Sequence, residues 1–435
     1  ASPLSLQDRL GNTIENSNTI TLNGNLRMEK LYNKIPYLKE LNRSSRRRGG
    51  RNTGSARRGS TAQNNQNQAD TTQKKSQVGK AILDNTLKFL MMWKDASITY
   101  TSSKGNLMPG FSPEPGALGN NWSQMAPGIG YVFGWENDIT RLKDHQMWLQ
   151  RLDSNLVTQN YNKYNTNLNL RATLEPLRDL RIELTATRTY SYTKESKYTY
   201  SEGLDDFTQT NARESGSFSM SFFTFTTAFD NIADDNSTKS YTRMKENRIK
   251  MAIRLANENP YYNGEIIDST QYPSGYSKSA QDVLLGSFIA AYTNRSPDKI
   301  PLNYFPAIPF PNWRITYKGL SRIPALRQLF KNVTITHSYR SSYNIGTYQS
   351  RLTYEDIDNL GYPSAVNANG DFINKYQLTL LSITEQFSPL IKLDMTWNNS
   401  LLTNLEFKRS RNLSFSFSNN QLTEVASNEY IIGLG

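Results

Sequence analysis

Two histidines, His145 and His337, are the only residues in the chain that could provide the imidazole of a zinc site or of a hydrolytic triad. The sequence contains no cysteine, which excludes disulfides and thiolate metal ligands. Neither histidine has a ligand or nucleophile motif beside it, and His337 falls in an alternating run of strand type. We therefore expect structural histidines, no enzyme activity, no metal site and no cofactor.

One glycine pattern could in principle cradle a phosphate, namely Gly128-Ile129-Gly130. Its third glycine, Gly134, comes one position too late for the dinucleotide fingerprint, and no strand is expected before it. The pattern lies in a stretch dense in glycine and proline, which we place at 105–160. Ordered irregular backbone is the better interpretation, and a helix carrying His145 is expected to follow at 138–152.

Arginines are concentrated in residues 43–79, where no acidic residue lies among them before Asp70 and an amide tract follows them. Low hydrophobicity with concentrated positive charge predicts a disordered loop. A segment of this kind could grip RNA, but no aromatic residue is interleaved for base stacking. We favour a solvated loop that touches anionic lipid or lipopolysaccharide headgroups, and no nucleic-acid partner.

The elements that must carry any function are strands, and the last third of the chain shows them best. Apolar residues alternate with polar ones on both sides of a turn at Asn398-Asn399, and the alternation resumes after a polar break at 408–412. Side chains of a strand point to opposite faces in turn, so each strand has one apolar and one polar face. The residues predicted here to face lipid are Ile391, Leu393, Leu405 and Phe407.

A second hairpin is expected at 164–193. Its predicted lumen-facing residues are Asn167, Asn169, Arg171, Thr173, Arg181, Glu183 and Thr185, and its predicted lipid-facing residues are Leu168, Leu170, Leu180, Ile182 and Leu184. Beyond them, Arg188, Tyr190 and Tyr192 continue the apolar side. Cations and aromatic rings after an apolar run are typical of the headgroup level of a transmembrane strand. A soluble β-sandwich with long strands is the alternative.

No apolar stretch approaches the roughly 18 residues of a membrane-spanning helix, so any spanning must be done by strands. The chain shows no signal peptide and begins with Ala, and a strand at 430–434 stands at its end. We interpret it as a processed chain or a piece of a longer one. The composition, with 25 Tyr, 18 Phe and a net charge of +12, favours β structure with one wet face.

The predicted organisation has five parts. Residues 1–42 hold a strand and a short helix, and 43–79 the arginine-rich loop. Residues 80–229 hold barrel strands, including one at 87–101, interrupted by the 105–160 insertion. Residues 230–311 form a helical excursion, expected as a cap or plug because a loop of that length is usually functional or disordered. Residues 312–435 hold the C-terminal barrel strands, with separate strands expected at 333–339 and 343–348.

Several strings resemble the C-terminal part of the SprA/Sov family, the outer-membrane translocon of the type 9 secretion system in Bacteroidota. They are Asn312-Trp313-Arg314-Ile315-Thr316-Tyr317-Lys318-Gly319-Leu320, Ile323-Pro324, Ser338-Tyr339-Arg340-Ser341, Glu385-Gln386-Phe387-Ser388-Pro389-Leu390, Met108-Pro109-Gly110-Phe111 and Val132-Phe133-Gly134. The resemblance covers nearly the whole chain apart from the arginine-rich loop.

This resemblance implies an all-β fold in which the chain forms a segment of a very large transmembrane antiparallel β-barrel. It implies the outer membrane of a Gram-negative bacterium as location, and export of folded proteins, with a role in gliding motility in some species. The implied partners are the remainder of the barrel polypeptide, a PorV-like outer-membrane barrel, a periplasmic plug protein and secreted cargo proteins. An outer-membrane nutrient receptor or porin, and a soluble adhesive or carbohydrate-binding β-protein, are the alternative functions.

Overall fold

The structure is a computed structural model that describes residues 11–40, 86–87, 91–135, 148–149, 159–201, 206–235 and 237–435. The predicted arginine-rich loop at 43–79 lies outside the described residues, as does His145 with most of the helix predicted at 138–152.

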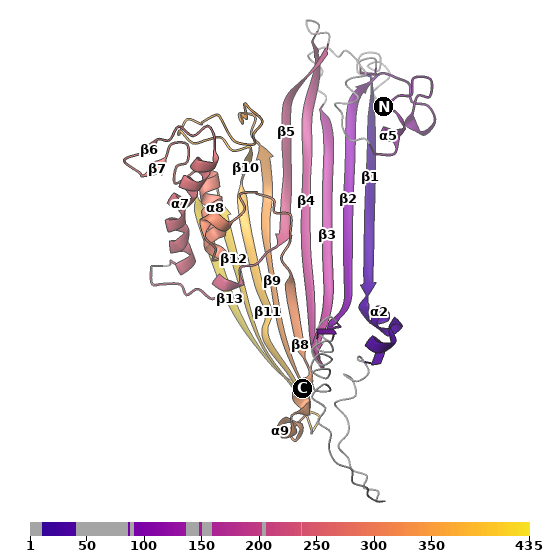
Figure 1. Ribbon diagram of the computed structural model, residues 1–435, viewed down its shortest axis with the longest axis vertical. Coiled ribbons are helices and arrows are strands. Elements are labelled where there is room, and N and C mark those ends of the chain that lie inside the picture. Colours follow the sequence, from indigo (N-terminus) through magenta and orange to yellow (C-terminus); the bar gives the residue numbers. More distant parts are fainter. Residues whose placement is uncertain are drawn as a thin grey trace, which may run out of the picture.

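One large antiparallel sheet organises the described chain (Figure 1). Its order is β1 (Asn12–Arg27), β2 (Trp93–Phe111), β3 (Asn160–Leu177), β4 (Leu180–Ser201), β5 (Asp206–Ser221), β9 (Phe330–Ser350), β11 (Leu380–Trp397), β12 (Leu402–Ser416) and β13 (Gln421–Leu434). The short strand β10 (Tyr376–Leu378) pairs with β9, and β8 (Asn312–Tyr317) pairs with both β4 and β9. The all-β expectation is thereby confirmed at the level of an antiparallel sheet.

The strands β5 and β8 occupy one position in the sheet. β5 pairs with the upper part of β4 and β8 with its lower part, and β9 continues the pairing of both on the other side. The chain therefore leaves the sheet after Ser221, in the middle of a strand position, and returns to it at Asn312. The side-chain amide of Asn312 donates to the Ser221 hydroxyl at 3.4 Å, and this hydroxyl also accepts from the Thr187 amide at 2.8 Å.

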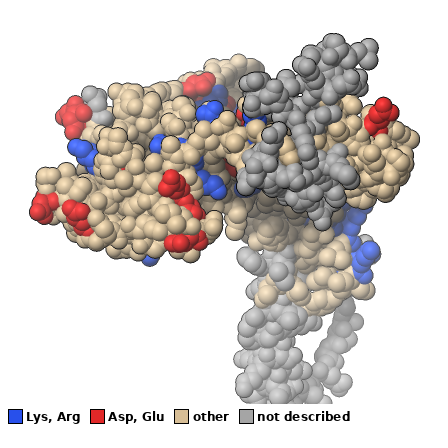
Figure 2. All heavy atoms as spheres, turned by 90° about the horizontal axis from the view of Figure 1, so that it is seen from above, with Lys and Arg blue, Asp and Glu red and all other residues tan. Residues whose placement is uncertain are grey.

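The segment between these two points, residues 222–311, is called the excursion below. It contains η3 (Phe225–Thr227), α7 (Lys239–Glu258), the small hairpin β6 (Ile266–Ile267) and β7 (Tyr272–Pro273), α8 (Gln281–Tyr292) and η4 (Pro297–Lys299). It stands in front of the half of the sheet that carries β12 and β13 (Figure 1). From above it is part of a thick lobe whose acidic and basic side chains are interspersed (Figure 2).

The main hydrophobic core lies between the excursion and the sheet. Every residue of α8 from Val283 to Tyr292 is buried, which is why this helix is apolar all round. Met251 of α7 and Phe288 of α8 belong to this core together with Leu381, Ile383, Leu413 and Phe415 of the sheet. Gly286 lets the two helices approach closely, because a Cβ there would lie 2.7 Å from the Met251 sulfur.

Several predicted boundaries were wrong. The strand expected at 87–101 begins at Trp93 and continues to Phe111, so residues 105–111 are strand and not insertion. The strands expected at 333–339 and 343–348 are one strand, β9. The polar break expected at 408–412 lies inside β12, where all five residues pair with β13 and residues 409–412 also pair with β11. Polar side chains do not end a strand whose backbone bonds are all satisfied by neighbours.

The remaining short helices connect the strands. They are α2 (Met28–Lys34), η1 (Ala117–Gly119), α5 (Ile129–Val132), η5 (Gly319–Arg322) and α9 (Pro324–Arg327).

Candidate functional site

Strand register decides which residues share a face, because residues directly opposite each other in an antiparallel pair point to the same side. One row of opposite residues can be followed across the whole sheet. It runs Leu22, Tyr100, Leu168, Arg188, Met220, Tyr343, Ile383, Leu413 and Glu424. The side on which these residues lie is called the apolar face, and the opposite side the polar face.

The apolar face carries a continuous band of apolar side chains, which crosses this row on β1, β2 and β3 and lies below it on the other strands. The band consists of Ile20, Leu22 and Leu26 of β1; Ala96, Ile98 and Tyr100 of β2; Leu168, Leu170, Ala172 and Leu174 of β3; Leu180, Ile182, Leu184 and Ala186 of β4; Trp313, Ile315 and Tyr317 of β8; Val333 and Ile335 of β9; Ile391, Leu393 and Met395 of β11; Leu405 and Phe407 of β12; and Tyr430, Ile432 and Leu434 of β13. Much of it is exposed, with Leu22 at 61% and Ile432 at 74% of their accessible surface. All residues predicted to face lipid lie in this band.

The residues predicted to line a lumen all lie on the polar face. Hydroxyl and amide side chains bond from strand to strand along it, as in Thr189 to Asn167 at 2.6 Å and Ser219 to Asn344 at 2.6 Å. Arg181 and Glu183 form an ion pair of 2.9 Å on the same face. The sheet brings the two predicted sets onto opposite sides, as the two-residue period requires.

The polar face is hollowed. A depression of about 540 Å³ is lined mainly by small polar side chains of β1, β2, β3, β4, β5 and β9, among them Ser17, Ser103, Asn165, Ser191 and Ser217. The hollow crosses six neighbouring strands of the sheet.

The apolar band runs obliquely across the strands. On β1 its centre is residue 23, one residue below Leu22 in the row defined above, whereas on β13 its centre is residue 432, eight residues below Glu424. The band therefore shifts by seven residues over the eight steps between β1 and β13. The rise is about 3.3 Å per residue and the spacing about 4.8 Å between strands. The strands are therefore tilted by roughly 30° from the direction perpendicular to the band.

The excursion lies on the apolar face. Its helices cover Leu381, Ile383, Leu413 and Phe415, which belong to the same face as the band and lie above it on their strands. A plug inside a lumen bordered by the polar face would have to lie on the other side of the sheet. The excursion packs against the apolar face, so a plug and a lumen lined by the polar face exclude each other, whereas the expectation of a cap stays a prediction.

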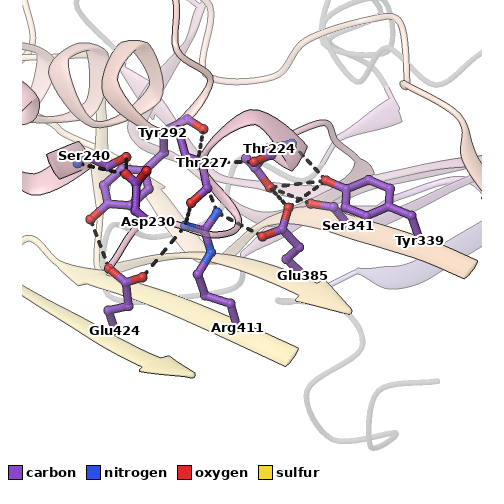
Figure 3. Close-up of polar contacts among 10 residues, drawn as sticks. All are labelled: Thr224, Thr227, Asp230, Ser240, Tyr292, Tyr339, Ser341, Glu385, Arg411 and Glu424. Atoms are coloured by element: carbon purple, nitrogen blue, oxygen red, sulfur yellow. Dashed lines mark hydrogen bonds and ion pairs between the residues drawn. The ribbon is translucent and has the colours of Figure 1, made fainter. Parts of the chain in front are cut away.

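A buried polar network connects the excursion to the four adjacent strands β9, β11, β12 and β13 (Figure 3). Arg411 of β12 and Glu385 of β11 are opposite each other and almost fully buried, and their guanidinium and carboxylate lie 2.9 Å apart. A second carboxylate, Glu424 of β13, lies 3.8 Å from Arg411. The guanidinium also donates to the Thr227 carbonyl at 2.6 Å and to its hydroxyl at 3.1 Å.

Glu385 is held by hydroxyl groups as well. The hydroxyls of Thr224 and Tyr339 each donate to one carboxylate oxygen at 2.8 Å, and the Tyr339 oxygen accepts from the Thr224 amide at 3.0 Å. One turn of the excursion, η3 with its N-cap Thr224, is thus bonded to the sheet at both ends through a buried charge pair. Alternation alone gave no signal for this network, because Arg411 lies in the stretch predicted as a polar break and Glu385 was not assigned to either face of a predicted strand.

A cavity of about 350 Å³ lies between the helices and residues 301–304 and 354–376, lined by carboxylates and tyrosine rings together with apolar side chains. Burial raises the pKa of Asp282 in its wall to about 6, opposed by the hydrogen bond that the Tyr304 hydroxyl donates to it. Burial and the neighbouring Asp282 carboxylate also hold the pKa of Tyr304 well above its usual range.

The residues first considered for chemistry have structural environments. The Nδ1 atom of His337 lies 2.6 Å from the Leu390 carbonyl oxygen, and its ring neighbours Trp313 and Phe387. Gly128 precedes α5, and its amide donates to the Asn120 side chain at 3.0 Å. Among the described residues no group of three or more His, Asp or Glu side chains could hold a metal ion.

These features define an all-β protein built on one broad antiparallel sheet with an apolar and a polar face. In the comparisons with known proteins, no family model matches the chain and no curated protein matches it. Within the described residues, no helix has the length and apolar character needed to cross a membrane.

Proposed function

We propose that this chain forms part of the wall of a transmembrane β-barrel in the outer membrane of a Gram-negative bacterium. The observation that carries the proposal is the oblique apolar band, which is exposed on one face and backed by a polar face with bonded hydroxyls and amides. On β3 the band reaches from Leu168 to Leu174, which is about 20 Å along the strand, comparable with the apolar belt of about 25 Å in outer-membrane barrels.

Aromatic side chains border the band. Trp93, Tyr317, Phe330 and Trp397 lie near its lower edge, where the rings of Phe330 and Trp397 are 4.4 Å apart. Trp313 and Tyr339 stack at 4.5 Å near its upper edge on β8 and β9. Aromatic girdles at both interfaces are typical of membrane barrels. A soluble sandwich would cover the band with a second sheet, and no such sheet lies over it among the described residues.

The strands extend further above the band than below it. Outer-membrane barrels have short periplasmic turns and longer extracellular parts, so the upper end in Figure 1 corresponds to the outside of the cell. The tight turns between β3 and β4 and between β11 and β12 then face the periplasm.

We further propose that the wall conducts folded proteins in type 9 secretion, as the resemblance to the SprA/Sov family implies. The sheet does not close on itself within the described residues, since β1 and β13 are each paired on one side only. Such a wall fits a wide cylinder completed by further strands, with the polar face toward the lumen. The remaining barrel polypeptide, a PorV-like barrel, a periplasmic plug and cargo proteins would be its partners.

Membrane placement is tested by single-cysteine substitutions, because the chain has no cysteine of its own. Asn169→Cys should react with a charged, water-soluble thiol reagent, whereas its neighbour Leu170→Cys should resist that reagent and, once labelled with a fluorophore, be quenched by spin-labelled lipid. Equal reactivity at both positions, with no lipid quenching at either, would contradict a membrane wall.

Protein conduction is tested by single-channel conductance of the native barrel with any plug protein removed. A very wide pore is expected to conduct well above a general porin under the same salt. Conductance of ordinary porin size would favour the nutrient receptor or porin instead.

A further inference from the structure

The two arms that connect the excursion to the sheet expose apolar side chains where they leave it and return to it. Phe229 and Ile232 lie on the departing arm and are 47% and 59% exposed. Ile308 and Phe310 lie on the returning arm and are 80% and 39% exposed. These four residues are called the foot of the excursion. Four large apolar side chains so exposed at one end of a packed helical element indicate a contact surface.

The foot is continuous with the upper edge of the apolar band. The Phe229 ring lies 5.2 Å from that of Phe387, which is one row above Ile391 on β11. On the other side, Pro309 and Pro311 close an apolar groove of about 440 Å³ whose floor includes Leu170 and Leu184. The foot and the apolar band therefore form one continuous apolar surface, and the medium that surrounds the band also surrounds the foot.

Arginine side chains stand beside the rings of the foot. The guanidinium of Arg409 lies 5.1 Å from the centre of the Phe229 ring, and that of Arg295 lies 5.7 Å from the Phe310 ring. Arg188 follows the band on β4 and donates from Nε to the Pro306 carbonyl at 2.9 Å. Asp234 and Asp235 follow Ile232 in the departing arm, so the surface is not purely basic.

Apolar rings with cations directly behind them match the boundary between acyl chains and phosphate headgroups. We propose that the foot docks on the surface of the lipid bilayer, with its four apolar side chains at the acyl boundary and its arginines at the level of the lipid phosphates. The excursion would then brace the barrel from outside, at the leaflet on the long-strand side. This inference rests on the proposed membrane wall.

The experiment compares three single-cysteine variants of the native protein, each labelled with an environment-sensitive fluorophore in phosphatidylcholine and phosphatidylglycerol vesicles. Ile308→Cys reports on the foot and Ile432→Cys on the band, where Ile432 is 74% exposed. Val366→Cys is the matched control, because Val366 is also exposed, at 54%. It lies beside the segment that pairs with Gly275, close to β7 and at the end of the excursion that is far from the foot. The vesicles carry a spin label either near the headgroup or near the end of the acyl chain.

The expected result is strong quenching of the Ile308 label by the shallow spin label, quenching of the Ile432 label by at least one of the two, and none at Val366. Quenching at Ile432 without quenching at Ile308 would overturn the docking while leaving the membrane wall intact. A blue-shifted, unquenched Ile308 label would overturn it too, because a second copy or another membrane protein would then cover the foot. Absence of quenching at both positions would remove the wall and the docking together.

Discussion

At the scale of single residues, Arg411 is the centre of the contacts that attach the excursion to the sheet. It is 3% exposed and contacts Glu385, Glu424 and Thr227, which lie on two other strands and on the excursion. A buried guanidinium is costly to desolvate, so it persists only where several acceptors surround it. Through these contacts Arg411 connects η3 of the excursion to the sheet.

Removing one partner of this buried pair should strongly destabilise the folded state. Glu385→Gln leaves Arg411 without its buried counter-charge, and Arg411→Met leaves Glu385 without its own. Each is expected to lower the free energy of unfolding by about 3–5 kcal/mol, as for other broken buried pairs. Denaturant titration followed by near-ultraviolet circular dichroism measures the change.

The double variant with Glu385→Leu and Arg411→Met is the control for this prediction. Because it removes both charges, it should be less destabilised than the sum of the single variants. Strict additivity of the two losses would show that the charges do not interact.

The Asp282 carboxyl predicts a pH dependence of the excursion. Its pKa is raised to about 6 from an ordinary value of 3.8, so between these values the folded state binds more protons than the unfolded state. Stability is therefore expected to fall as pH rises from about 4 to about 6, and to stay lower above that range. Asp282→Asn keeps an acceptor for the Tyr304 hydroxyl and removes the titrating group, so it should flatten this profile.

Thermal unfolding of the excursion at a series of pH values, measured by limited proteolysis between α7 and α8, tests the profile. A wild-type midpoint that stays constant over this pH range, or a variant that keeps the same slope, would count against the assignment.

At the scale of elements, the strands obey a strict alternation that should tolerate charge on one side only. Leu170 lies near the middle of the apolar band on β3, and its neighbour Asn169 lies on the polar face. Leu170→Arg is expected to cost about 2–4 kcal/mol of folding free energy in a bilayer, the usual penalty for arginine at the midplane of a membrane barrel.

Asn169→Arg is the matched substitution and should cost much less. Comparing the stability of both variants in the same phospholipid vesicles measures the difference. Equal losses at the two positions would argue that the two faces meet the same environment.

At the scale of the whole molecule, the oblique course of the apolar band makes a prediction about orientation. If the band is level with the bilayer, the strands are tilted by roughly 30° to its normal, near the range of about 35–45° in membrane barrels. Polarised infrared spectroscopy of the amide bands in oriented bilayers measures this angle. Strands that lie upright or flat in the membrane would contradict the proposed wall.

The sequence by itself determined the local alternation, and with it the two faces of each strand. Leu168 and Leu170, for example, were assigned to one face and Asn167 and Asn169 to the other because side-chain direction has a period of two residues whatever the neighbours are. The helical character of residues 230–311 was predicted as well, and the structure has long helices there at 239–258 and 281–292.

Only the tertiary structure decided how the strands pair and how their faces combine into one sheet. It joined the runs around His337 and Tyr343 into one strand, paired Arg411 with Glu385 inside what looked like a polar break, and inserted the excursion in the middle of a strand position. It also set the excursion on the apolar face. Such features depend on register and on pairing between residues far apart in the chain, which a periodicity of two or of 3.6 residues does not encode.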